Sequence, residues 1–150
     1  STVAAPVTFL GVLFATHFTG VYDLALRSRW VHDLEHLGYL LSAVMLWSVV
    51  LAPNSAKAVG RIGAAFAVIA GSAALGVVLM SADRPLVATY ARRLGTAEAL
   101  DDQRLAASLM WVGGMASSLP LLMIAVWTWA SGEQRRAERA EHLADYSTVE

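Results

Sequence analysis

Four long stretches without a charged side chain most constrain how this chain can fold. They cover residues 4–22, 37–56, 62–82 and 105–132. Each approaches or exceeds the roughly 20 residues that a helix needs to cross about 30 Å of hydrocarbon. Because backbone polar groups must pair internally in lipid, the stretches are predicted to be helices rather than open sheet. The chain is 57% hydrophobic and only 15% charged, which favours the same conclusion.

The sequence therefore predicts an all-α protein, an integral membrane bundle of four transmembrane helices. We expect the spans at about residues 4–22, 33–53, 60–82 and 103–131, within a domain of residues 1–132. Residues 133–150 are expected to form a polar tail. The third span should end before Asp83-Arg84-Pro85, because proline removes a backbone donor and restricts the residue before it. Gly63, Ala67 and Gly71 form a row of small residues that predicts close helix packing.

Charges at the ends of the spans do not decide the orientation of the bundle. Six Lys and Arg residues fall at one end and five at the other, counted over the predicted loops and tail. Trp127 and Trp129 precede the charged tail and resemble interfacial anchors. We therefore expect the tail to be cytoplasmic and the opposite end to be extracytoplasmic, in a multi-pass protein of the bacterial inner membrane.

Three histidines are predicted to meet at that opposite end. His17 lies near the end of the first span, and His32 and His36 lie four residues apart at the start of the second. Ionisable residues at membrane depth are costly and are functional candidates. Imidazole ligands suit copper, zinc, iron and nickel. The sequence thus predicts a site at these histidines for a transition metal, or for a haem held by two of them.

Seven further side chains are expected to share this end of the bundle. Glu35 could orient a histidine ring by pairing with the second nitrogen of that ring, and Met80 and Met110 could supply thioether ligands. Each also has a structural explanation, because acidic residues suit helix N-termini and methionine commonly fills cores. The residues of this predicted site face are Tyr22, Asp23, Glu35, Asp83, Gln103, Met80 and Met110.

Several function classes are disfavoured by the composition and motifs. The chain has no cysteine, which excludes thiolate ligands and disulfides. Its net charge of −1 gives no electrostatic case for nucleic acid. It contains no nucleophile elbow, P-loop or zinc-protease motif, and no carboxylate falls in the middle of a predicted span. We therefore do not expect an enzyme.

Four strings resemble, in order, the CtaG-like cytochrome c oxidase assembly family, a membrane type associated with copper delivery. The strings are His17 followed by VYDLAL at 21–26, HDLEHL at 32–37 running on to Trp47, ADRPL at 82–86 with Tyr90, and DQRLA at 102–106 running on to MWVGG at 110–114. Their order and spacing match the family over about residues 14–130. Thr16 and Thr19 stand where the family usually has tryptophan and proline. The chain looks like a shortened or divergent member.

The resemblance implies a membrane protein that binds copper at His17, His32 and His36 on the extracytoplasmic face. The alternative is a non-catalytic accessory subunit of a larger respiratory or photosynthetic membrane complex, derived from the same family. The expected partners are the lipid bilayer and other integral membrane subunits, with cytochrome c oxidase among them.

Overall fold

The computed structural model describes residues 1–52 and 58–147, and 88% of these are helical. The described ranges contain six helices and no strand. The prediction of an all-α fold is confirmed. The helices are α1 (Ala4–Phe18), α2 (Val21–Ala25), α3 (Arg29–Val50), α4 (Ala58–Ser81), α5 (Ala88–Leu94) and α6 (Thr96–Ser147).

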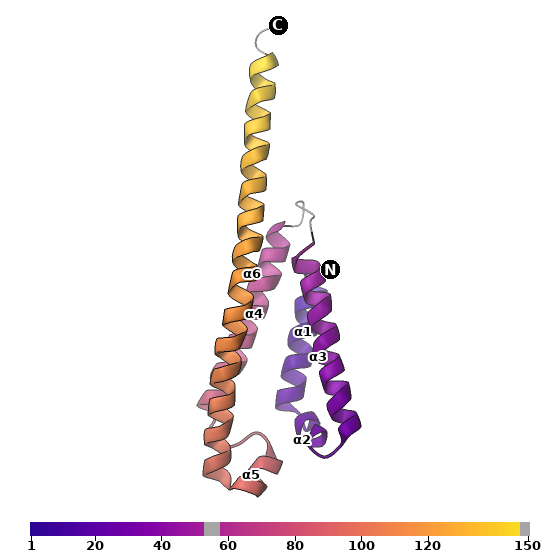
Figure 1. The fold of residues 1–150 in the computed structure, drawn as a ribbon, viewed down its shortest axis with the longest axis vertical. Helices are drawn as coiled ribbons and strands as arrows, with labels where there is room; N and C mark the ends of the chain where they lie inside the picture. Colours follow the sequence, from indigo (N-terminus) through magenta and orange to yellow (C-terminus); the bar gives the residue numbers. More distant parts are fainter. Residues whose placement is uncertain (53–57, 148–150) are drawn as a thin grey trace.

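The long helices run roughly along one axis, and the two short ones lie together at one end (Figure 1). Helix α4 packs beside α6, α1 packs beside α3, and α1 also contacts α4. We call the end that carries α2 and α5 the site end. It also holds the adjoining ends of α1, α3, α4 and α6, whereas the start of α1 and the C-terminal end of α6 lie away from it.

Local sequence explains where the helices stop at the site end. After α1, the Thr19 hydroxyl donates to the carbonyl of Ala15 and accepts the backbone N–H of Val21. Helix α4 ends at Ser81, just before the predicted Asp83-Arg84-Pro85 stop. Gly95 separates α5 from α6 with a φ of 91°, a conformation that side-chain-bearing residues rarely adopt.

Small and branched apolar residues form the core where α1, α3 and α4 meet. Its buried members are Ala5, Leu46, Val50, Ala64, Ala65 and Val68. A second buried cluster, of Leu75, Leu79 and Ala107, joins α4 to α6 nearer the site end. These two clusters fix which faces of the helices turn inward.

Two described helices, α4 and α6, are long and apolar enough to cross a membrane. Helix α1 is apolar but has 15 residues, or about 22 Å at 1.5 Å per residue. Helix α3 has 22 residues, and Arg29, Asp33 and Glu35 fall in its first two turns. A membrane protein is supported on these grounds, and the count of four spans stays a prediction.

Helix α6 is continuous from Thr96 to Ser147 and passes through Pro120 without a break in helical structure. It extends well beyond the other helices at the end away from α2 and α5 (Figure 1). Its residues from Glu133 to Ala144 are all exposed. The predicted boundary at residue 132 therefore falls inside one uninterrupted helix.

Candidate functional site

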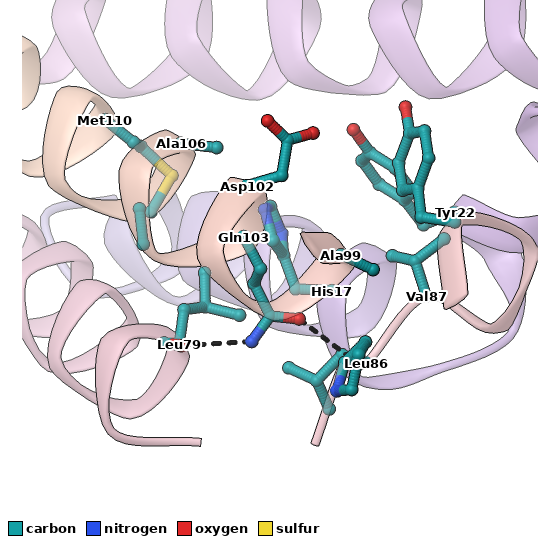
Figure 2. Close-up of a pocket in the computed structure, with 13 residues that line it drawn as sticks. His17, Tyr22, Leu79, Leu86, Val87, Ala99, Asp102, Gln103, Ala106 and Met110 are labelled. Carbon is teal, nitrogen blue, oxygen red and sulfur yellow. Dashed lines mark hydrogen bonds between the residues drawn. The ribbon is translucent and has the colours of Figure 1, made fainter. Parts of the chain in front are cut away.

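The site end encloses a cavity of about 300 Å³ between α1, α2, α4, α5 and α6 (Figure 2). Its polar lining residues are His17, Tyr22, Tyr90, Asp102 and Gln103. Leucine, valine, alanine, proline and methionine side chains make up the rest of the wall. A mostly apolar cavity with a few convergent polar groups is the usual form of a small-molecule site.

Gln103 holds three segments together at the wall of this cavity. Its side-chain nitrogen donates to the Leu79 carbonyl at 3.0 Å, and its oxygen accepts the Leu86 backbone N–H at 2.8 Å (Figure 2). Leu79 belongs to α4, Leu86 to the connection that follows, and Gln103 to α6. Since both ends of the amide are used, the predicted site residue Gln103 has a structural role here.

Asp23 ties α2 to α5 across the site end. One carboxylate oxygen accepts the backbone N–H of Thr89 at 2.9 Å. The other lies 3.1 Å from Arg27 and 3.7 Å from Arg92. Both arginines also donate to the Thr89 hydroxyl, at 3.2 and 2.9 Å. We call these four residues, Asp23, Arg27, Thr89 and Arg92, the α2–α5 latch.

The latch lowers the pKa of Asp23. The largest cause is the hydrogen bond from the Thr89 backbone N–H, which lowers the pKa. Burial raises the pKa, and the Thr89 hydroxyl and the two arginines lower it further. A donor that hydrogen-bonds the charged carboxylate favours ionisation. The carboxylate at position 23 is therefore charged, and the latch closed, at neutral pH.

A chain of hydrogen bonds runs through the contact between α1 and α3. The Tyr39 hydroxyl donates to Glu35 at 3.2 Å and lies 2.6 Å from the Thr16 hydroxyl. Thr16 in turn lies 3.3 Å from Nδ1 of His17. Glu35 is only 8% exposed. This predicted site residue thus faces the protein interior, where its polar partners offset the cost of burial.

The structure divides the three predicted metal ligands between two surroundings. His32 and His36 are exposed on α3, with ring centroids 4.2 Å apart. His17 lines the cavity, and its Nδ1 lies 2.8 Å from the Leu13 carbonyl. Within the described residues, no group of three or more His, Cys, Asp or Glu side chains is placed to hold a metal ion.

The remaining predicted residues have mixed surroundings. Met80 and Met110 pack against the Leu75, Leu79 and Ala107 cluster, and Met110 also lines the cavity. Asp83 is exposed on the connection between α4 and α5. Of the ten predicted residues, the cavity brings together His17, Tyr22, Gln103 and Met110.

Sequence reasoning did not single out Thr16, Thr89 or Asp102 as site residues. Thr16 and Thr89 are buried threonines that join separate helices. Asp102 lines the cavity, although its position also suits a helix start. A signal existed for Thr16, since a hydroxyl inside an apolar helix requires a hydrogen-bond partner. Thr89 sits in a polar segment and carried no such signal.

The curated relatives that the chain matches are mycobacterial proteins without an assigned function. Uncharacterised proteins of Mycobacterium bovis and Mycobacterium tuberculosis are each 26% identical to it over 153 residues. One from Mycobacterium leprae is 27% identical over 149 residues. These alignments cover 93–95% of the chain but only 22–23% of each relative. The chain thus spans about a quarter of their length.

No solved structure matches the chain. A family model does: the one described as cytochrome c oxidase caa3 assembly factor (Caa3_CtaG) covers residues 1–132. The match includes the cavity, the latch and all three histidines of the site end. It leaves out only the projecting part of α6 and the residues after it. The chain belongs to the cytochrome c oxidase caa3 assembly factor family.

Proposed function

We propose that this protein acts in the membrane in the assembly of cytochrome c oxidase, and that it holds copper at the site end. Family membership supports the assembly role and a non-catalytic protein. The apolar helices α4 and α6 support the membrane setting. Four spans, with the site end extracytoplasmic, are part of the proposal. The finer assignment of copper rests on the side chains of α3.

The observation that carries the copper proposal is the contact between His32 and His36. The rings are 4.2 Å apart, and both side chains are exposed. Asp33 lies 3.6 Å from Nδ1 of His32, where it can orient that ring and leave Nε2 for a ligand. Two imidazoles are a donor set that suits copper.

Among the described residues no three His, Cys, Asp or Glu side chains are placed to hold one ion together, so the site that we propose is the His32 and His36 pair. An ion held by two ligands keeps open coordination positions. A second protein can bind at those positions and take the ion away. This is the behaviour expected of a protein that delivers copper to an oxidase rather than keeping it.

The copper proposal is tested by measuring retained copper on purified protein after loading with Cu(I) and exhaustive dialysis. We expect the His32→Ala/His36→Ala double variant to lose the copper. His142→Ala is the matched control, because His142 is exposed on α6 far from the site end. His17→Ala tests the third predicted ligand. Copper that stays unchanged in the double variant would refute the α3 site, and a Soret band after expression with haem would favour haem instead.

A second candidate, the accessory subunit, is favoured by the surface of α6. Only 6% of the most apolar stretch of this helix is buried. This face would suit helices of a larger complex as well as it suits lipid. Purification in a mild detergent separates the two functions. A fixed stoichiometry with a membrane complex, without retained copper, would favour the subunit.

A further inference from the structure

A second cavity lies farther from the site end than the first. It has a volume of about 270 Å³ and lies between α1, α3, α4 and α6. Its wall on α4 runs from Val68 to Ala73, near the middle of that helix. Aromatic and aliphatic side chains surround it, with small residues at its α6 side; they include Phe9, Leu46, Trp47, Trp111, Gly114 and Ser118.

The two cavities share one lining residue, Met110. The polar groups of the first cavity lie at the site end, and the apolar second cavity lies toward the middle of α4. Methionine has three rotatable bonds and no branch, so it adapts to what lies beside it. Met110 therefore lies where the two spaces meet.

We infer that the two cavities together bind a single-chain amphiphile whose head carries a protonated nitrogen. The order of polarity along the site matches that of a lipid in a bilayer, with the head at the end of the spans and the chain inside. If a methylene fills about the same roughly 30 Å³ as a water molecule, the 270 Å³ cavity holds about nine methylenes of one chain.

Asp102 provides the charge complementarity for the head. Its exposed carboxylate lines the first cavity, as the Tyr22 side chain does (Figure 2). The ion pairs formed in the described part of the chain use Asp23, Asp33, Asp101 and Glu133, and leave Asp102 out. A protonated nitrogen would give Asp102 a charge-assisted hydrogen bond.

His17 provides a second polar group in the lining of this cavity, from α1. Its Nδ1 faces the Leu13 carbonyl at 2.8 Å, which leaves Nε2 for the ligand. With Nδ1 protonated by this arrangement, Nε2 accepts a hydrogen bond from the head. Asp102 and His17 therefore both favour a head group that donates hydrogen bonds, rather than a phosphate or a carboxylate.

Two tryptophans in the apolar cavity allow a direct test, because bromine on a hydrocarbon chain quenches a nearby indole. Trp47 and Trp111 line that cavity. The protein is reconstituted in phosphatidylcholine nanodiscs with Trp30, Trp127 and Trp129 replaced by Phe. It is then titrated with a decylammonium brominated near its chain end, and with the matching brominated decanol. We expect saturable quenching by the ammonium probe.

Head recognition is tested with Asp102→Asn against Asp101→Asn. Asp101 lies beside Arg104 and does not line the cavity. Loss of a hydrogen bond between charged groups is expected to weaken the ammonium probe about tenfold in Asp102→Asn. The alcohol probe should bind equally to both variants. Equal weakening of both probes in Asp102→Asn would refute the head assignment.

Chain recognition is tested with Gly114→Leu against Gly113→Leu. Gly114 lines the apolar cavity and Gly113 does not, and a Cβ atom on either meets nothing within 4 Å. Both variants should therefore fold, and the leucine at position 114 should remove the saturable quenching by both probes. Quenching that rises linearly and equally in every variant would mean simple partition into the bilayer and would overturn the inference. None of these outcomes depends on copper.

Discussion

At the scale of single residues, the site end is organised by polar side chains that satisfy one another. Asp23 receives the Thr89 backbone N–H, Gln103 uses both ends of its amide, and Glu35 receives the Tyr39 hydroxyl. Buried polar groups are costly unless they are paired. These pairs therefore fix how the helix ends meet, and they leave Asp102 and the second nitrogen of His17 for a ligand.

The α2–α5 latch predicts a pH dependence. Because the folded state lowers the pKa of Asp23 below its ordinary value of 3.8, the latch contributes its full stability above that value. The contribution is lost as the pH falls through the lower, folded pKa. We expect the protection of the Thr89 amide from hydrogen exchange to drop several-fold in that range, after correction for the intrinsic exchange rate.

Two substitutions separate the hydrogen bond of the latch from its charge. Asp23→Asn keeps a carbonyl oxygen that can accept the Thr89 N–H, and Asp23→Ala does not. The arginine partners are more than half exposed, so their ion pairs should add little. We expect Asp23→Ala to lose more Thr89 protection than Asp23→Asn, and both to lose the acid dependence. An unchanged acid dependence in Asp23→Ala would contradict the latch.

At the scale of helices, packing singles out one member of a predicted row of small residues. A Cβ atom at Gly71 would lie 2.6 Å from a Leu10 methyl group, so the Leu10 side chain of α1 packs directly against Gly71 of α4. A Cβ atom at Gly63 would meet nothing within 4 Å. The sequence row predicted a close approach, but only the structure shows which position makes it. The row says which residues share a face of α4, and α1 covers only part of that face.

This difference predicts opposite effects for two identical substitutions. Gly71→Leu should lower the free energy of unfolding by about 1–3 kcal/mol, the usual cost of overpacking. Gly63→Leu should leave it unchanged or raise it by up to about 1 kcal/mol, because leucine favours a helix more than glycine does. Thermal unfolding in detergent measures both. If Leu10→Ala does not restore the stability lost in Gly71→Leu, the contact between Leu10 and Gly71 is refuted.

At the scale of the whole molecule, the start of α1 and the C-terminal end of α6 both lie away from the site end (Figure 1). This arrangement fits the proposed even number of spans, with the site end on one side of the membrane and the projecting part of α6 on the other. The family match covers the bundle and ends at residue 132, close to where α6 leaves the other helices. The residues that the family model matches thus include the part of the chain that we propose to lie in or near the bilayer.

The absence of cysteine makes the topology directly testable, because any introduced thiol is the only one. We expect Arg29→Cys, at the site end, to react with a membrane-impermeant maleimide on intact cells. Ala140→Cys, exposed on the projecting helix, should react only after lysis. The reverse pattern would place the histidines in the cytoplasm. Labelling of both thiols on intact cells would place them on one side of the membrane, and would exclude the three spans that the four-span proposal puts between them.

The sequence by itself determined that this chain is helical, where α4 stops, and to which family it belongs. These properties depend on local composition, proline and the order of short strings, so they can be read without knowing any contact. The candidate site was only partly predictable. The residues predicted to share one end of the bundle do belong to the site end. Of these, His17, Tyr22, Gln103 and Met110 line one cavity.

Only the tertiary structure decided which sides of the helices face inward. Beyond its first turns α3 is apolar on nearly every side, so periodicity could not tell whether Glu35 or the neighbouring histidines would be buried. Packing against α1 turned Glu35 toward Tyr39 and left His32 and His36 exposed. The cavity and the latch arise in the same way, because each joins residues more than 60 positions apart whose contact no local pattern encodes.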